Sequence, residues 1–455
     1  MNQNNKMADM PVNKLMISMG IPMILSMMLQ AVYNIVDSAF VGRIKEVGEY
    51  ALNALTLAFP IQMLMISVAI GTGVGMGAAV SMHLGQGDRE QSSKTAGNAI
   101  FLAGIIYIAF LLFGVFGVNT YISSQTSNSL VIDMAVSYLR ICCIISFGIT
   151  FFSIFEKLLQ ATGNSLYSTI AQIAGAITNM ILDPILIYGW FGFPASGVKG
   201  AAYATVIGQI VSMIFALVFH IKKNKDIHNG FAYMRPSLHI IKRIYAIGIP
   251  AIIAQALMSI MTYGLNLILG KIDESVVTAY GIYYKIQQFI LFAAFGLRDA
   301  ITPIVSFSYG SRNKQRINAG IRYGLLYTLM IMLFGTVLME LFSGPLSELF
   351  GLSGGTREIC ISAMRIISIS FVFAGANIAY QGIFQALESG NESLIVSVCR
   401  QFLFVLPIAW IFSCIIGNSL DKTWLVWTTF IIAEGVSCLI AIGMMKKIKK
   451  KKISD

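Results

Sequence analysis

Long apolar segments run through the whole chain and constrain its fold more than any other feature. A segment of about 20 mostly apolar residues is long enough to cross a bilayer. Twelve such segments fall near residues 15–41, 51–82, 95–118, 131–159, 165–188, 200–221, 243–269, 276–308, 318–341, 358–386, 393–416 and 423–445. Only 12% of the 455 residues are charged, against about 25% in a soluble domain, so charge cannot cover a globular surface. We therefore predict an all-α integral membrane protein with twelve transmembrane helices.

The distribution of basic residues predicts the orientation in the membrane. With the N-terminus taken as cytoplasmic, 21 of the 32 Lys and Arg residues fall on the cytoplasmic side, 6 fall on the other side, and 5 lie within spans. This positive-inside bias predicts a multi-pass membrane protein with both termini in the cytoplasm. The basic C-terminal run KKIKKKK is expected to lie on the anionic inner leaflet rather than on nucleic acid.

The two halves of the chain repeat one another. Gly20-Ile21-Pro22 matches Gly248-Ile249-Pro250 at an offset of 228, and Gly163-Asn164 matches Gly390-Asn391 at an offset of 227. At an offset of 225, Ser81 matches Ser306. Six helices are an even number, so both halves enter from the same side, as in the parallel repeats of transporters. We predict an N-terminal lobe at 1–221, a basic cytoplasmic linker at 222–242 that lets the halves rock, a C-terminal lobe at 243–446 and a basic tail at 447–455.

Three acids lie inside apolar segments of the first half, where ionisable residues are costly and mark functional sites. They are Asp37, Glu156 and Asp183, and each belongs to a polar stripe with helical spacing. The stripes are Gln30, Tyr33, Asn34 and Asp37, then Ser153, Glu156 and Gln160, and finally Gln172, Asn179 and Asp183. A polar stripe that faced hydrocarbon would be costly, so each is expected to face the lobe interior or a cavity. The residues predicted to bind substrate are Gln30, Tyr33, Asn34, Glu156, Gln160, Gln172 and Asp183.

The same acids are candidates for binding a coupling ion. Carboxylates with amide and hydroxyl oxygens can bind a hard cation, and crowded, desolvated carboxylates can load a proton near neutral pH. The counterparts of the three acids in the second half are Leu265, Gln381 and Trp410, so the repeated fold does not require the acids. This asymmetry favours a cation or proton site in the first half.

A structural interpretation of the acids stays open at this point. They could pair with a basic residue and hold helices together, and Arg140 is the obvious partner. Its counterpart, Arg365, has no such acids opposite it. Charged residues of the second half also lie in spans, namely Lys285, Arg298, Asp299, Arg400 and Glu434. Of these, Glu434 is a functional candidate, but a weaker one than the three acids of the first half.

The sequence contains no signature of an enzyme or of a cofactor. It has no Walker A motif, so ATP is not expected to drive it. The run GTGVGMG at 71–77 lies in the middle of a span and is better explained by close helix packing. The four histidines are scattered and form no predicted metal cluster.

Taken together, these motifs resemble the multidrug and toxic compound extrusion (MATE) family over nearly the whole chain. The resemblance rests on YNIVDSAFVGRI in the first helix, the GQGD loop, ATGN before NMILDPILIYG in the fifth helix, and RDAITPIVSFSYGSRN and QALESGN in the second half. In detail the chain is similar to the bacterial MepA- and DinF-like branch. The resemblance implies a V-shaped pair of six-helix bundles with a central cavity, which exports drugs by antiport with Na⁺ or H⁺ through alternating access.

The resemblance also implies which residues couple the ion. The acids of the first and fifth helices, here Asp37 and Asp183, would bind H⁺ or Na⁺, with Asn179 one helical turn before Asp183. Tyr138, Glu156 and Thr205 match other polar positions of that lobe. The NorM-like branch also uses acids in helices 7 and 10, but helix 7 here has none and helix 10 has Glu358 at its edge. An ion site in the second lobe is therefore not expected.

The favoured function is thus a monomeric, cation-coupled antiporter of lipophilic, mostly cationic drugs, with no catalytic residue, no cofactor and no nucleic-acid partner. Pliable methionine and aromatic side chains suit ligands of varied shape. The alternative is a flippase of a lipid-linked precursor within the same superfamily, for which a basic rather than an acidic cavity would be expected. The sequence leaves the choice between H⁺ and Na⁺ open.

Overall fold

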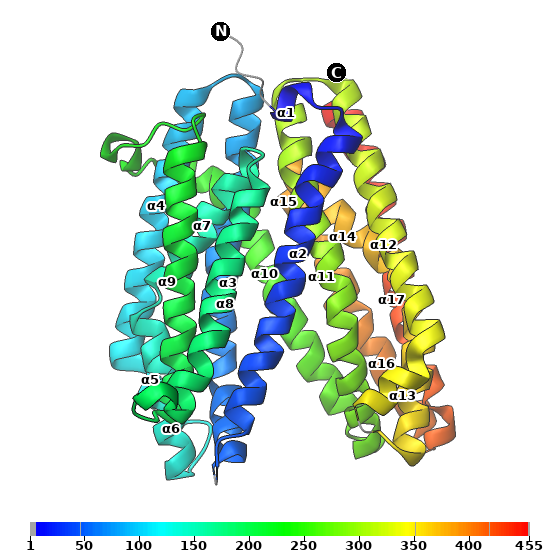
Figure 1. The fold of residues 1–455 in the computed structure, drawn as a ribbon. Coiled ribbons are helices and arrows are strands. Elements are labelled where there is room, and N and C mark those ends of the chain that lie inside the picture. The colour runs from blue at the N-terminus through cyan, green and yellow to red at the C-terminus, as the bar shows by residue number, and fades with distance from the viewer. Residues whose placement is uncertain (1–5, 46, 351, 418, 454–455) are drawn as a thin grey trace. The chain divides into compact units, whose positions relative to one another are not determined.

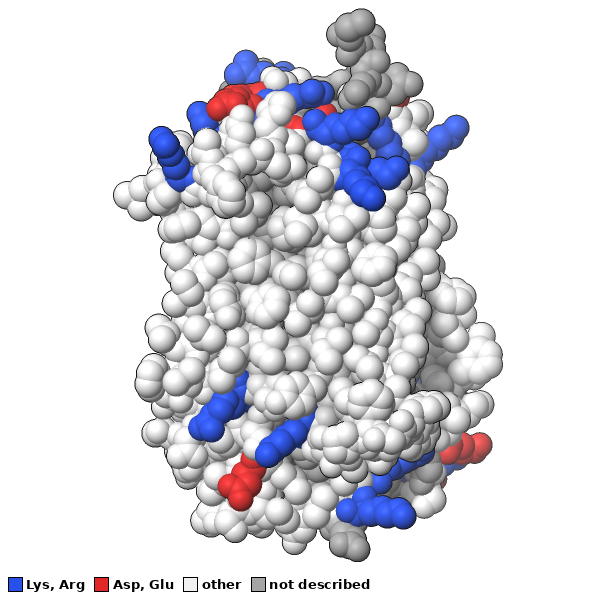
Figure 2. Space-filling model, turned by 60° about the vertical axis from the view of Figure 1, so that its left-hand side comes forward, with Lys and Arg blue, Asp and Glu red and all other residues white. Residues whose placement is uncertain are grey.

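The computed structural model describes residues 6–45, 47–350, 352–417 and 419–453, apart from the side chain of Asn34. The described residues form helices and contain no strand. Ten helical segments are long and apolar enough to span a membrane, and two bent helix pairs bring the number to twelve. The predicted all-α fold with twelve spans is therefore confirmed. On the face drawn in Figure 2, charged side chains gather at the two ends, with an uncharged band between them.

The helices of the first half, including its short segments, have the following bounds. They are α1 Lys6–Asp9, α2 Val12–Gly42, α3 Gly48–Gly85, α4 Arg89–Leu112, η1 Phe113–Gly117, α5 Val118–Ser123, α6 Ser129–Ile144, α7 Phe147–Ala161, α8 Ser165–Tyr188, η2 Trp190–Gly192 and α9 Gly197–Lys223. Most spans extend a few residues beyond the predicted apolar core, because the polar residues at their ends continue the helix. The short η3 (Phe231–Met234) lies in the connection to the second half.

The second half follows the same order of long helices. Its elements are α10 Leu238–Leu269, α11 Glu274–Gly310, α12 Lys314–Leu349, α13 Gly354–Ser368, α14 Phe371–Ala386, α15 Gly390–Val398, η4 Cys399–Leu403, α16 Val405–Ile416, η5 Leu420–Lys422, α17 Trp424–Ile448 and η6 Lys449–Ile453. Within each half the long helices run side by side (Figure 1). The predicted basic tail largely continues as helix, and Lys452 Nζ donates to the carbonyl oxygen of Leu387 at 2.6 Å.

Equivalent contacts in the two halves give the repeat a structural basis. The Ser81 hydroxyl donates to the carbonyl oxygen of Ala161 at 2.8 Å, and the Ser306 hydroxyl donates to that of Ala386 at 3.1 Å. Both pairs are related by the offset of 225. The fourth span of each half is bent, by 47° between α6 and α7 and by 51° between α13 and α14. The sequence did not predict these bends, since no proline or glycine lies at either break.

The chain divides into two compact units at residues that differ from the predicted lobes. Unit 1 contains residues 1–8 and 25–252, and unit 2 contains residues 9–24 and 253–455. Each unit thus includes the first part of a helix whose remainder belongs to the other unit, α10 in unit 1 and α2 in unit 2. Since this exchange depends on contacts between residues far apart in the sequence, the order of the hydrophobic segments could not reveal it.

Glycines allow these helix segments to pack closely. In unit 1, a Cβ added to Gly71 would lie 2.9 Å from the carbonyl oxygen of Gly248. In unit 2, a Cβ added to Gly296 would lie 2.8 Å from the carbonyl oxygen of Met23. Gly71 and Gly296 are repeat counterparts. The glycine-rich run at 71–77 therefore serves helix packing, as the sequence predicted.

The connection between α9 and α10 is fixed to unit 1 by several hydrogen bonds. The backbone N–H of His228 donates to Ser93 Oγ at 2.8 Å, and that of Ser237 donates to Asn98 Oδ1 at 2.7 Å. Arg89 also forms an ion pair with Asp226 at 2.9 Å. The residues of the predicted linker at 222–242 thus belong to unit 1.

Candidate functional site

Two helices of unit 1 bring the acids Asp37 and Asp183 into one buried cluster. Asp37 lies near the end of α2 and is 9% exposed, whereas Asp183 lies near the end of α8 and is fully buried. The two carboxylates are close enough to interact electrostatically. Within the described chain, Oδ1 of Asp37 has no hydrogen-bond partner, and no ion pair involves either acid. The predicted basic partner, Arg140, is exposed on α6.

Asn179 connects Asp183 to the neighbouring helix α9. With its amide nitrogen facing Asp183, it donates to Oδ2 at 3.3 Å, and its amide oxygen accepts from the backbone N–H of Thr205 at 3.1 Å. The hydroxyl of Thr205 is buried and has no hydrogen-bond partner among the described residues. The site therefore combines carboxylate oxygens with a hydroxyl oxygen, ligand types that hard cations take, while the amide nitrogen of Asn179 faces Asp183.

Tyrosine hydroxyls complete the surroundings of Asp37. Tyr33 and Tyr138 both lie within electrostatic range of its carboxylate. The side-chain amide of Gln62, on α3, donates to the Tyr138 hydroxyl at 3.2 Å and lies 3.5 Å from Cys142 Sγ. We use the name acidic site for Asp37, Asp183, Asn179, Thr205, Tyr33, Tyr138 and Gln62. The sequence analysis missed Gln62, although an amide inside an apolar span is the same signal that identified the stripes.

Glu156 belongs to a separate polar group on α7. Its Oε1 accepts from the Gln160 amide at 3.2 Å, while Lys157 Nζ donates to Gln160 Oε1 at 3.1 Å. Lys157 also lies 3.9 Å from Glu156 Oε2, and its side chain packs against Gly73 on α3. All three polar side chains are buried. Glu156 is therefore partly neutralised by a basic neighbour, unlike the two aspartates.

The remaining predicted substrate residues lie on the same helices as the two aspartates. Gln30 and Tyr33 are half-buried on α2, and Gln172 is half-buried on α8, two turns before Asn179. The side chain of Asn34 lies outside the described part of the structure.

The repeat counterparts of the acids do not form a second acidic site. Leu265 is fully buried in an apolar core, and the Gln381 amide donates to Ser397 at 3.0 Å. Trp410 is 53% exposed. Among the described residues, no group of three or more His, Cys, Asp or Glu side chains could hold a metal ion.

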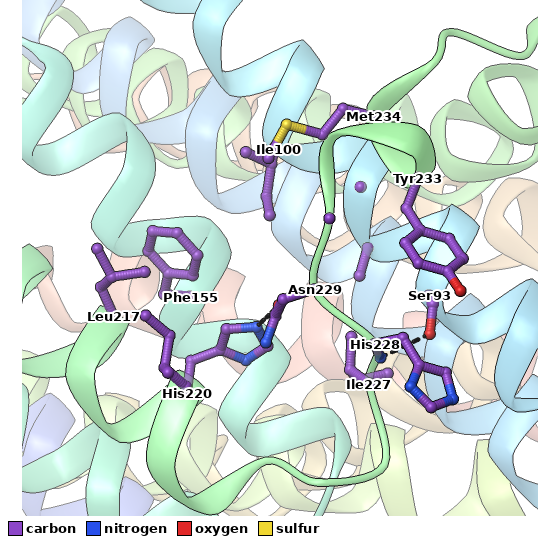
Figure 3. Close-up of a pocket in the computed structure, with 14 residues that line it drawn as sticks. Ser93, Ile100, Phe155, Leu217, His220, Ile227, His228, Asn229, Tyr233 and Met234 are labelled. Carbon is purple, nitrogen blue, oxygen red and sulfur yellow. Dashed lines mark hydrogen bonds between the residues drawn. The ribbon is translucent and has the colours of Figure 1, made fainter.

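Unit 1 also contains a cavity of about 170 Å³ beneath the fixed connection (Figure 3). Ile100, Phe155 and Leu217 contribute apolar surface, and no charged side chain lines it. His220 is one of the residues that line it, and its Nε2 is 2.7 Å from Asn229 Oδ1. Because this cavity has no charged group, it is not a candidate for the ion site.

Twelve spans in two parallel repeats, with buried carboxylates that lack a basic partner, are the features of a secondary membrane transporter. A family model described as MatE matches residues 22–185 and 250–411, one stretch in each half. The chain belongs to this family.

Relatives and solved structures match over nearly the full length. "Multidrug export protein MepA" of Staphylococcus saprophyticus is 24% identical over 444 residues, and the protein of the same name in Staphylococcus aureus strain COL is 25% identical over 460 residues. Each alignment covers 98% of this chain and 96% of the relative. The outward-facing conformation of a multidrug resistance MATE family transporter has a TM-score of 0.91, with 25% identity and 99% coverage of both chains.

Another solved structure is that of a MOP superfamily transporter from Pyrococcus furiosus. It is described as having a binding pocket of reverse polarity, which suggests a different function for that protein. It has a TM-score of 0.88 and 25% identity, and the match covers 98% of this chain and 99% of that chain.

Proposed function

We propose that this chain exports lipophilic, mostly cationic small molecules across the plasma membrane in exchange for a cation, H⁺ or Na⁺, that binds at the acidic site. The observation that carries the proposal is the pair of buried aspartates without a basic partner. Buried charges are normally paired, so an unpaired acidic pair calls for an exchangeable cation. The names of the staphylococcal relatives support drug export as the activity.

The charge of the acidic site argues for antiport rather than for movement of an anionic lipid precursor. A carboxylate pair attracts a cation and repels a phosphate headgroup. If drug and coupling ion compete for these carboxylates, binding of one releases the other. The site consists of residues of one chain, so we expect the monomer to be the transporting unit. We also expect both of its termini to lie in the cytoplasm.

Efflux from proteoliposomes tests this proposal. A lipophilic cation such as tetraphenylphosphonium is loaded, and a Na⁺ gradient or a pH gradient is imposed separately. One of the two gradients should drive efflux, and Asp37→Asn and Asp183→Asn should each abolish the driven component. Asp133→Asn, which neutralises an exposed acid on α6, is the matched control and should keep it. Driven efflux that survives in both aspartate variants would refute the assignment.

A further inference from the structure

Unit 2 contains a buried ion pair that the proposed transport cycle does not use. Arg400, in the π-helical segment η4, donates through Nε and Nη2 to Oε1 of Glu434 on α17, at 3.0 and 2.7 Å. Nε also lies 3.1 Å from Oε2. The residues are 5% and 8% exposed. This is a two-pronged guanidinium–carboxylate contact, the geometry in which arginine binds a carboxylate most tightly.

A third helix completes the surroundings of the carboxylate. The amide nitrogen of Asn377, on α14, donates to Oε2 of Glu434 at 2.8 Å and to its backbone carbonyl at 3.0 Å. The Tyr283 hydroxyl on α11 lies within electrostatic range of Glu434. The amide oxygen of Asn377 and the hydroxyl of Tyr283 are buried and have no hydrogen-bond partner in the described chain.

The pair lies near the middle of its spans. Arg400 is ten residues after Gly390, where α15 begins, and Glu434 is ten residues after Trp424, where α17 begins. At about 1.5 Å per residue, each lies about 15 Å from the start of its helix, in a span that must cross a hydrocarbon core about 30 Å thick. Charges at this depth are costly and mark functional sites, and π-helical segments are frequent at such sites.

The repeat shows that the fold does not need this arginine. At the offset of 227 that relates α8 to α15, the counterpart of Arg400 is Ile173. One lobe therefore holds acids without a basic partner, whereas the other holds an acid with a guanidinium bound to it. The two lobes thus differ in how these buried acids are neutralised: a side chain of the protein does so for Glu434 in the second lobe, whereas no described side chain does so for Asp37 or Asp183 in the first.

We propose that Glu434, Asn377 and Tyr283 form a monovalent-cation site whose cation is the side chain of Arg400. Because this cation is covalently attached, the second lobe is always loaded and exchanges no ion. Cation exchange then takes place at the acidic site alone. This last conclusion rests on the proposed function. Without Arg400, the two carboxylate oxygens, the Asn377 amide oxygen and the Tyr283 hydroxyl would offer oxygen ligands to a free cation.

Guanidinium binding to purified protein tests the proposal without transport. All variants carry Asp37→Asn and Asp183→Asn, so that the acidic site does not contribute, and guanidinium chloride is titrated by calorimetry at pH 8. Arg400→Ala should create one saturable guanidinium site, which Na⁺ weakens by competition. Adding Glu434→Gln should abolish that site. Arg400→Lys, which keeps a tethered charge, and intact Arg400 should bind no guanidinium.

Each other result overturns the inference. No saturable binding to folded Arg400→Ala, binding that survives Glu434→Gln, or binding with intact Arg400 would show that Glu434 does not hold an exchangeable cation in place of Arg400. If Arg400→Ala does not fold alone, guanidinium added during purification should restore a monodisperse protein. This rescue should be lost when Glu434→Gln is added. A protein that guanidinium does not rescue would also contradict the proposal. Failure of the proposed function would instead appear as undiminished efflux in the aspartate variants that retain Arg400.

Discussion

Neutralising Asp37 should stabilise the cation-free protein while removing its response to the coupling cation. In the absence of a cation, Asp37 and Asp183 are buried near one another without a basic partner. At an effective dielectric constant of about 20, two like charges in electrostatic contact repel by a few kcal/mol, on the order of 2 kcal/mol at a separation of about 8 Å. Asp37→Asn removes this repulsion and keeps the side-chain shape. We therefore expect the free energy of unfolding without coupling cation to rise by about 2 kcal/mol.

The wild-type protein should gain stability when its coupling cation binds. A ligand that binds the native state alone stabilises it by about 2.7 kcal/mol at a concentration of about 100 Kd. If the ion is Na⁺, added NaCl should raise the melting temperature of the wild type more than choline chloride does. If the ion is H⁺, the native site binds more protons than the unfolded chain, so stability should fall as the pH rises.

Thermal unfolding in detergent measures both effects, with Asp133→Asn as the control. Without the coupling cation, Asp37→Asn should have a higher melting temperature than the wild type. Adding the coupling cation should narrow or reverse this difference in melting temperature. The same response to Na⁺ and to pH in Asp37→Asn as in the wild type would refute the reasoning, because the cation would then bind elsewhere.

Three further variants test other parts of the structure. Glu156→Gln should weaken binding of lipophilic cations several-fold in fluorescence titrations, because it removes a buried negative charge and keeps the positive charge of its neighbour Lys157. Glu434→Gln should lower the free energy of unfolding by about 3–5 kcal/mol in denaturant titrations, since it leaves Arg400 buried and unpaired, whereas replacing both residues by glutamine should cost less. Gly97→Ala should release the connection from unit 1 and speed its cleavage by trypsin, because an added Cβ would collide with the backbone of Tyr233.

Local sequence patterns predicted the spans and picked out acids that the structure buries. The apolar segments located all twelve spans, and the stripe spacing identified Asp37, Asn179 and Asp183, which lie in one buried cluster. Both signals depend on periodicity and burial cost within single helices. The comparison of repeats added the asymmetry, because it showed Leu265 and Trp410 in place of two of the acids.

Features that depend on distant contacts were not predictable in the same way. The ion pair of Arg400 and Glu434 joins residues 34 positions apart on different helices, and spacing within a helix gives no sign of it. The amide of Gln62 inside an apolar span was a visible signal, but its contacts with Tyr138 and Cys142, 76 and 80 positions away, could not be predicted from spacing. The exchange of helix segments between the units likewise depends on contacts across about 180 to 270 residues, such as that of Gly71 with Gly248.

At one helix crossing, the two halves have the same packing but take the packed side chain from different helices. In unit 1, Lys157 on α7 packs against Gly73 on α3. In unit 2, the counterpart of Gly73 is Arg298, which packs against Gly382, the counterpart of Lys157. The crossing has room for one long basic side chain, and the two halves supply it from opposite helices.

An adjacent acid accompanies the base at both crossings. Lys157 lies beside Glu156, and Arg298 donates to Asp299 at 2.8 Å. Each lobe therefore holds a neutral acid–base pair at this crossing. The acidic site has no such compensation, because within the described chain no ion pair involves Asp37 or Asp183. The scaffold thus compensates the buried charges at both crossings but leaves those of Asp37 and Asp183 uncompensated, which supports the proposal that a cation binds there and is exchanged.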